Sequence, residues 1–255
     1  MPTSAMETQT GSALFVGAGH GIGLGLVCTY LRRNPQKIAW ATYRDAEKAG
    51  GLKLAVEKFG GRLKMVQCNP TEDDELAACF QDIKAEHRYL ELIVTSVGML
   101  HNERVRPEKS LRRIQKQALE ETFLVNTISV ALLAKHAKSF FPKAVPSSFV
   151  ALSAMVGSIS DNAVGGWYGY RASKAALNMF LKTMSIELKR EGYPTRIFAI
   201  HPGTTKTGLS ENFLAGVKHR IWTPDEAAVN ILDVITNTEA ESGSFLNWNG
   251  QTIPW

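Results

Sequence analysis

The sequence predicts an α/β protein built on a single doubly wound parallel sheet, with helices on both faces. Three observations predict this fold class. Short apolar runs alternate with longer helical patterns along the whole chain. The apolar runs are nearly continuous, as in parallel strands that are buried on both faces. A glycine-rich turn follows the first run, and folds of this class bind ligands at that edge, outside the carboxyl ends of the strands.

The elements follow a polar stretch, residues 1–11, which predicts a flexible tail before one domain over residues 12–255. Strands are predicted over the apolar runs 12–18, 37–43, 62–68, 90–98, 147–154, 195–203 and 242–248. Helices are predicted over 21–33, 46–60, 71–87, 110–140 and 168–190, and from Thr223 onward. Thr71 is expected to cap its helix, and Asn34-Pro35 to end the first one.

Composition narrows the class of protein. Apolar residues make up 44% and charged residues 21% of the 255 residues, the balance of an ordinary globular protein. No apolar stretch is long enough for a membrane helix, and no signal peptide is recognisable, so we expect a cytoplasmic protein. Cys28, Cys68 and Cys79 form no C-x-x-C motif, which favours reduced thiols and no metal site.

The net charge of +5 suits an anionic cofactor. The densest basic stretch, residues 104–116, is interrupted by acids and has no interleaved aromatic residues. We therefore expect a solvated helix face there and no nucleic-acid partner.

The segment GAGHGIG lies between the first strand and its helix, with glycines at spacings of four and two. Gly17 permits the tight turn, while Gly21 and Gly23 let the backbone approach a pyrophosphate at the helix N-terminus. His20 can add positive charge when protonated, and Ile22 belongs to the same turn. This turn predicts a dinucleotide site, with close strand–helix packing as the structural alternative.

The end of the second strand predicts which cofactor is bound. Arg44 stands there, where a guanidinium would pair with the 2′-phosphate of NADP. An acid at this point would instead accept hydrogen bonds from the ribose of NAD. We therefore expect NADP(H) rather than NAD(H), with a surface Arg44–Asp45 ion pair as the alternative.

The segment GGWYGYRASKAALNM offers a second chemical motif. Tyr170 and Lys174 are four residues apart and share one helix face, whereas Tyr168 has Ala172 at that offset. A nearby ammonium lowers the pKa of a phenol, which can then exchange a proton with an alcohol or carbonyl oxygen. The structural alternative is a core tyrosine beside a lysine that extends to solvent.

The order of the glycine turn, Ser153, Tyr170 and Lys174 on one α/β chain resembles the short-chain dehydrogenase/reductase family, whose fold is Rossmann-like. The resemblance covers residues 12–255. GGWYGYRASKAALNM and the closing FLNWNGQTIPW look most like the subgroup of the bacterial C-factor protein and the carbonyl reductase Sniffer. It implies an oxidoreductase that transfers a hydride between a nicotinamide cofactor and a carbonyl or alcohol substrate.

The same resemblance implies roles for further residues. Asn126 would hold a water in a proton relay to Lys174, which also binds the nicotinamide ribose. Pro202 and Gly203 would line the cofactor, and Thr207 would contact the nicotinamide carboxamide. The family also suggests a homodimer or homotetramer that is joined through helices 110–140 and 168–190.

The sequence departs from the family pattern at three points. The segment after the fourth strand reads Thr95–Gly98 instead of Asn-Asn-Ala-Gly, so the usual amides are missing although Gly98 still permits close approach of the cofactor. Asn69 replaces the usual aspartate near the adenine, where its amide can still form a hydrogen bond.

The third departure concerns the hydroxyl that binds the substrate oxygen. The fifth strand ends in Ser153-Ala154 where the family has two serines, so the expected hydroxyl is absent at Ala154. We favour Ser153 as its replacement, and Ser158 in the following loop is the alternative. This change also motivates a second hypothesis, a nucleotide-binding regulatory or signalling protein with vestigial catalysis. Pocket walls are expected from the loop 157–170, through Asp161, Asn162, Trp167 and Tyr168, and a cover from residues 210–221.

Overall fold

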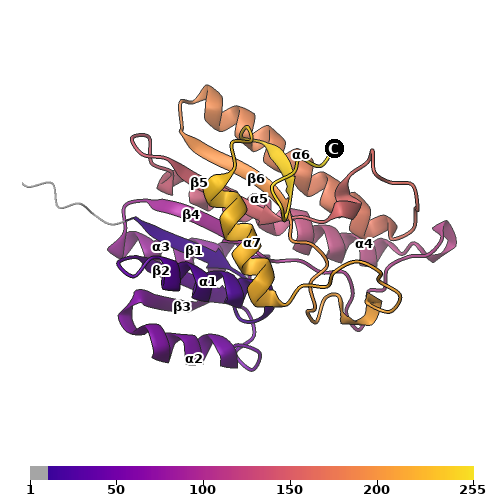
Figure 1. Ribbon diagram of the computed structural model, residues 1–255, viewed down its shortest axis with the longest axis horizontal. Helices are drawn as coiled ribbons and strands as arrows, with labels where there is room; N and C mark the ends of the chain where they lie inside the picture. Colours follow the sequence, from indigo (N-terminus) through magenta and orange to yellow (C-terminus); the bar gives the residue numbers. More distant parts are fainter. Residues whose placement is uncertain (1–10) are drawn as a thin grey trace, which may run out of the picture.

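The computed structural model describes residues 11–255, so the tail predicted for residues 1–11 lies outside the described residues except for Gly11. Seven strands form one sheet in the order β3-β2-β1-β4-β5-β6-β7 (Figure 1). Every neighbouring pair in this sheet is parallel. The predicted doubly wound parallel sheet is therefore confirmed.

The strands are β1 Ser12–Val16, β2 Ile38–Tyr43, β3 Leu63–Gln67, β4 Leu90–Thr95, β5 Ser147–Leu152, β6 Thr195–His201 and β7 Ser244–Asn247. The α-helices are α1 Gly21–Arg33, α2 Gly50–Phe59, α3 Asp73–Glu86, α4 Lys116–Phe123, α5 Ser129–Ala137, α6 Tyr168–Arg190 and α7 Pro224–Asn237. The order reverses beside β1, because β2 lies on one side of it and β4 on the other. A doubly wound sheet opens its ligand crevice at such a point.

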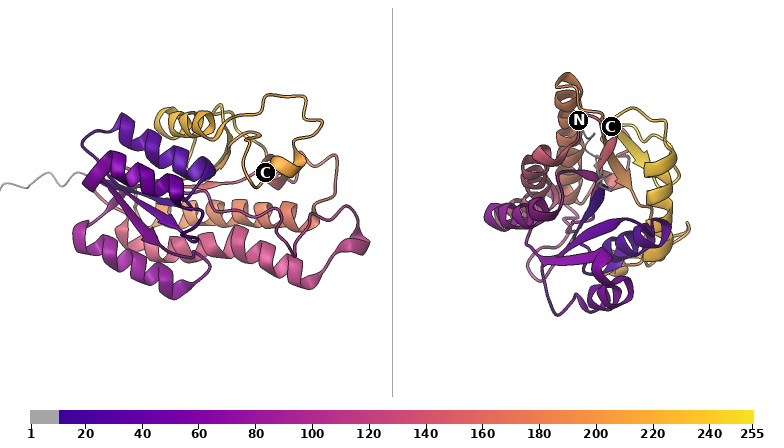
Figure 2. Two further views of the ribbon diagram at one scale, coloured as in Figure 1. Left: turned by 90° about the horizontal axis from the view of Figure 1, so that it is seen from below. Right: turned by 90° about the vertical axis from the view of Figure 1, so that its left-hand side faces the viewer.

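Each face of the sheet has its own hydrophobic core. Leu14 and Val16 pack with residues of α3, α5 and α6, whereas Ala13 and Phe15 pack with residues of α1, α2 and α7. This division follows from the alternation of side chains along a strand. Figure 2 shows α1 and α7 on one side of the sheet and α3, α5 and α6 on the other.

The helix predicted over 110–140 is shorter and interrupted. It begins at Lys116, passes through a π-helical turn at Leu124–Ile128 and continues as α5 to Ala137. Before it, Leu111–Arg113 form only a single 3₁₀ turn. The π turn contains Asn126, whose side chain is hydrogen-bonded outside the helix. A turn of this kind inserts one residue into the helix and often marks a functional site.

Two helix starts also differ from the prediction. Glu72, not Thr71, is the N-cap of α3, and the Thr71 hydroxyl bonds the Glu72 carboxylate instead of a helical N–H. The helix predicted from 46 begins at Gly50, which places its glycine pair in the first turn. The start of α7 agrees with the prediction, since Thr223 and Glu226 form a reciprocal capping box there.

Candidate active site

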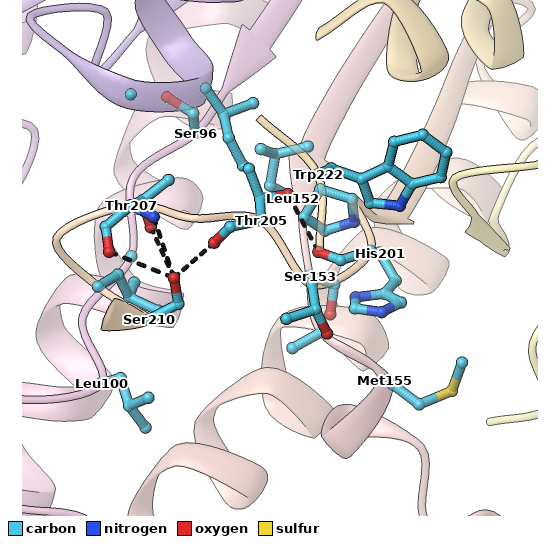
Figure 3. A pocket seen from close by; sticks show the side chains of 18 of the residues that line it. Ser96, Leu100, Leu152, Ser153, Met155, His201, Thr205, Thr207, Ser210 and Trp222 are labelled. Atoms are coloured by element: carbon cyan, nitrogen blue, oxygen red, sulfur yellow. Dashed lines mark hydrogen bonds between the residues drawn. The ribbon is translucent and has the colours of Figure 1, made fainter. Parts of the chain in front are cut away.

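A cavity of about 650 Å³ lies at the carboxyl ends of β1, β4, β5 and β6 (Figure 3). It is also bordered by the start of α6 and by the segment 202–222. Twelve of the predicted site residues line it: Gly17, His20, Gly21, Ile22, Gly23, Gly98, Ser153, Tyr170, Lys174, Pro202, Gly203 and Thr207. The other three, Arg44, Asn69 and Asn126, are not part of its lining.

The glycine turn forms a cradle of backbone at the start of α1. Gly17 and Gly21 have φ values of 80° and 58°, which side-chain-bearing residues rarely adopt. A Cβ at Gly23 would overlap the Gly17 carbonyl oxygen. The N-cap residue His20 makes no side-chain hydrogen bond to the first turn of α1. This end of α1 can therefore present its amide N–H groups to a pyrophosphate, and the cradle fits a dinucleotide.

The turn after β4 supports this cradle despite its missing amides. The Ser96 hydroxyl donates to the carbonyl oxygens of Val16, at 3.2 Å, and Gly17, at 3.0 Å. Ser96 thus braces the glycine turn, a role that sequence reasoning did not assign to it. A Cβ at Gly98 would lie 3.5 Å from Lys174 Nζ, so the backbone of Gly98 passes close to that ammonium.

Tyr170 and Lys174 are both buried on α6, and Lys174 Nζ donates to the Leu152 carbonyl at 2.9 Å. Burial lowers the pKa of Lys174 to about 8, because the charged form loses its hydration. Burial raises the pKa of Tyr170. The expected lowering of the phenol pKa by Lys174 is therefore wrong for the protein alone, where desolvation raises this pKa.

The N-terminus of α6 is held by a residue far away in the sequence. The Glu108 carboxylate accepts a hydrogen bond from Gly169 N at 3.1 Å, and the Glu108 carbonyl accepts one from Trp167 N at 2.6 Å. Trp167 is the N-cap and has a left-handed φ of 51°. Its ring lies 6.2 Å from that of Tyr170 and 5.2 Å from that of Phe213. Glu108 thereby fixes the turn that carries Tyr170. Sequence reasoning missed it, because no local pattern pairs residues 61 positions apart.

Asn126 is fully buried next to this site. Its Oδ1 accepts from Met99 N at 2.7 Å, and its Nδ2 donates to Met99 O at 2.9 Å and to Ser173 Oγ at 3.0 Å. The side chain therefore holds the segment after β4 against α6. With the amide engaged in these bonds, the main chain of Asn126 is the part that could hold a relay water.

The two candidate serines lie in different places. Ser153 lines the cavity, whereas Ser158 donates to Pro254 O and is not part of the lining. The Ser153 hydroxyl, however, donates to Asn178 Oδ1 at 2.7 Å. Asn178 Nδ2 donates to Gly157 O, which fixes the orientation of the amide. Ser153 therefore has no free proton for a substrate oxygen, which corrects the role predicted for it.

The end of β2 carries an exposed Arg44 that has no ion pair with any described residue. The alternative Arg44–Asp45 pair is not formed. Asp45 instead accepts a hydrogen bond from Glu47 N and lies 3.6 Å from Lys48 Nζ. Asn69 Oδ1 accepts from Thr71 N, in the turn that leads to α3.

Three aromatic residues missed by sequence reasoning help to form the cavity wall: His201, Trp222 and Trp248. The rings of Trp222 and Trp248 are 4.7 Å apart, and a Cβ at Gly203 would lie 2.8 Å from Trp222. The predicted cover contributes Phe213 and other apolar residues of the segment 209–217. Of the predicted loop residues, Trp167 lines the cavity, but Asp161, Asn162 and Tyr168 do not.

Within residues 11–255, no cluster of three metal-ligating side chains is found. None of the helices described for this chain is long and apolar enough to cross a membrane.

Dinucleotide-dependent oxidoreductases are the class of protein that such a sheet and such a cavity define. The family model described as short chain dehydrogenase matches residues 12–217, and the chain therefore belongs to the short-chain dehydrogenase/reductase family. It is an NAD(P)-dependent enzyme of that family, as the sequence predicted.

Similar proteins support this assignment. The short-chain dehydrogenase RED3 of Pyricularia oryzae is 29% identical over 97% of this chain and 100% of its own length. C-signal of Myxococcus xanthus is 36% identical over 41% of this chain and 58% of its own. Among solved structures, the carbonyl reductase Sniffer of D. melanogaster has a TM-score of 0.83 at 24% identity and covers 96% of this chain and 100% of its own. A short-chain dehydrogenase/reductase from Burkholderia multivorans, solved with bound NADP, has a TM-score of 0.81 at 22% identity, with the same coverage. C-signal and Sniffer agree with the predicted subgroup.

Proposed function

We propose that this enzyme interconverts a small-molecule carbonyl compound and its alcohol, with NADP(H) as cofactor and Tyr170 as the acid/base. The observation that carries the proposal is the burial of Tyr170 and Lys174 in the same cavity as the glycine cradle. A bound nicotinamide would supply or accept the hydride, a reaction that no protein side chain performs. The side chains of the protein bind and orient the cofactor and the substrate, and they move the proton.

In the direction of reduction, Tyr170 donates its proton to the carbonyl oxygen. Lys174 uses one ammonium proton on the Leu152 carbonyl and has two left. These bind the nicotinamide ribose and stabilise the phenolate as it forms. The Pro202-Gly203 turn and Thr207 orient the nicotinamide. Both Tyr170 and Lys174 are buried, and burial strengthens such interactions because the effective dielectric constant is low inside a protein.

The proton that Tyr170 loses returns through Lys174. The π turn at Asn126 interrupts the regular α-helical hydrogen bonding, and a main-chain carbonyl there is the group that we assign to the relay water. The side chain of Asn126 keeps this carbonyl in place through Met99.

Cofactor preference is assigned to Arg44. Its exposed guanidinium follows β2 and has no ion pair with a described residue, while Asp45 is engaged with Glu47 and Lys48. Asn69, at the turn after β3, is assigned to the adenine. Arg44→Ala is expected to weaken NADPH binding at least tenfold and to leave NADH binding nearly unchanged. Dissociation constants from quenching of tryptophan fluorescence test this, and a larger loss for NADH would overturn the assignment.

The function itself is tested by NADPH oxidation over a panel of aldehydes, ketones and quinones. Tyr170→Phe is expected to lower turnover by at least a hundredfold, with NADPH binding retained. One observation favours a second candidate, a nucleotide-binding regulatory protein: the site has no hydroxyl at Ala154, and the Ser153 proton is engaged. Tight NADPH binding without Tyr170-dependent turnover on any compound would favour this second function.

We also propose a homo-oligomer that is formed through α4, the π turn and α6. Four apolar side chains on these segments are more than a third exposed: Leu124, Ile128, Met179 and Ile186. Met179→Glu with Ile186→Glu should convert the oligomer to a monomer in light scattering, whereas Leu54→Glu on α2 is the control. A cytosolic location fits the three free cysteines, Cys28, Cys68 and Cys79.

A further inference from the structure

His201 is a half-buried histidine to which the mechanism above gives no task. It is the last residue of β6, one position before the Pro202-Gly203 turn. Leu152 on β5 is in register with Ile200 on β6, and Ser153 N donates to Ile200 O at 2.8 Å. Ser153 and His201 are therefore level with each other on neighbouring strands, and Figure 3 shows the imidazole beside Ser153 in the cavity wall.

The imidazole has an unusual hydrogen-bonding state. Among the described residues that line the cavity, His201 alone has a buried side-chain nitrogen or oxygen without a partner, namely Nδ1. A buried polar atom without a partner is unusual, and because Nδ1 has almost no exposed surface, Nε2 is the ring nitrogen that a ligand in the cavity can reach. Burial lowers the pKa of His201 to about 4, with a smaller contribution from the charge of His219. The ring is therefore neutral at physiological pH and carries one N–H donor and one acceptor.

The cavity needs a donor, because the usual one is absent. Ala154 has no hydroxyl, and the Ser153 proton is bound to Asn178. The other hydroxyls of the wall also have partners. Thr205 donates to Gly203 O, and Ser210 bonds the Thr205 and Thr207 carbonyls. Thr204 Oγ1 lies 2.7 Å from His219 Nε2, and Thr207 Oγ1 lies 3.4 Å from Ser210 Oγ. Each serine and threonine hydroxyl among the described residues of the cavity wall therefore has a partner.

We propose that His201 replaces the missing hydroxyl at Ala154 and donates a hydrogen bond to the substrate carbonyl oxygen. This inference rests on the proposed carbonyl–alcohol chemistry and names a further catalytic residue for it. The carbonyl carbon gains the hydride, the oxygen gains the Tyr170 proton, and His201 keeps its own proton throughout. A neutral imidazole is suited to this task, because it polarises a carbonyl without a change of charge.

The decisive experiment combines loss and rescue. His201→Phe removes the donor but keeps a flat ring, and it is expected to lower kcat roughly 10²–10³-fold, the usual cost of one such donor. NADPH affinity, measured by tryptophan fluorescence, should change less than threefold. Ala154→Ser in the His201→Phe background should restore kcat at least tenfold, and this gain should be much larger than the change that Ala154→Ser causes in the wild-type background. An Ala154→Ser effect of equal size in both backgrounds would overturn the proposal.

Two further measurements keep the test decisive. If His201→Phe does not fold, His201→Gln keeps an amide donor and His201→Leu does not, so kcat should fall for leucine much more than for glutamine. Infrared spectra of the most rapidly reduced panel ketone, bound to Tyr170→Phe, should show a lowered carbonyl frequency that is lost when His201→Phe is added. If turnover depends on Tyr170 but is the same in wild type and in every His201 variant, the role of His201 is wrong and the proposed function still stands. If no panel compound shows turnover that depends on Tyr170, the proposed function itself is wrong.

Discussion

Gly23→Ala is the most direct test of the cradle, because the structure leaves no room for a methyl group there. The added Cβ would overlap the Gly17 carbonyl oxygen and lie under 3.0 Å from Ser96 Oγ and from the Cα of Ala18. Overpacking of this kind costs typically about 1–3 kcal/mol. The Ser96–Gly17 hydrogen bond, at 3.0 Å, would also be disturbed, which adds about 1 kcal/mol. We expect a loss of about 2–4 kcal/mol in the free energy of unfolding.

Urea unfolding measures the stability, and fluorescence quenching measures the NADPH dissociation constant. The matched control is Gly50→Ala at the first position of α2, where an added Cβ meets nothing within 4 Å. Alanine is the better helix former, so this variant should be as stable as wild type or gain about 0.5–1 kcal/mol. NADPH affinity should fall in Gly23→Ala and stay unchanged in Gly50→Ala. A Gly23→Ala protein with wild-type stability and NADPH affinity would refute the packing argument.

Three more predictions concern buried ionisable groups. Glu108→Ala should lower the free energy of unfolding by about 1–3 kcal/mol and reduce kcat, because Gly169 N loses its hydrogen-bond partner. Glu108→Gln should lose less stability, and a Glu108→Ala protein as stable as wild type would contradict this role. The pKa of Lys174 is lowered to about 8, so the unfolded chain binds more protons than the folded protein above that pH. In urea titrations, the free energy of unfolding of wild type should therefore rise by about 2 kcal/mol relative to Lys174→Met between pH 8 and about 9.5. The pKa of His201 is likewise lowered to about 4 from 6.5, so wild type should lose up to about 3 kcal/mol relative to His201→Gln as pH falls through this window. Equal pH profiles would contradict either assignment.

Local patterns predicted the elements best. The bounds of α1 and α6 coincide with the predicted ranges 21–33 and 168–190, because apolar periodicity and turn residues mark both ends. The cavity was also foreseeable, since the carboxyl ends of parallel strands meet at one edge of the sheet. Of the fifteen predicted site residues, the twelve that line the cavity follow strands or lie in the first two turns of helices at this edge.

What the sequence could not predict depends on contacts between distant segments. Glu108 reaches Gly169, and Asn126 reaches Met99, across 61 and 27 positions. No propensity or spacing encodes such partners. The hydrogen bond of Ser153 is a clear case, because only the packing of α6 against β5 places Asn178 Oδ1 2.7 Å from Ser153 Oγ. The long helix predicted over 110–140 was wrong for a related reason: the π turn at Asn126 depends on a partner outside the helix.

Burial of Tyr170 also bears on the direction of the reaction. Its pKa is raised by desolvation, so the phenol holds its proton across the neutral range. Reduction needs that proton, whereas alcohol oxidation needs the phenolate, which burial opposes. The kcat for ketone reduction should therefore be flat between about pH 6 and 8, while the kcat for oxidation should still be rising at about pH 9. A bound cofactor and the Lys174 ammonium both stabilise the phenolate and so lower the pKa of Tyr170. An oxidation rate that levels off below pH 7 would mean that they outweigh desolvation. The preference for reduction would then not hold.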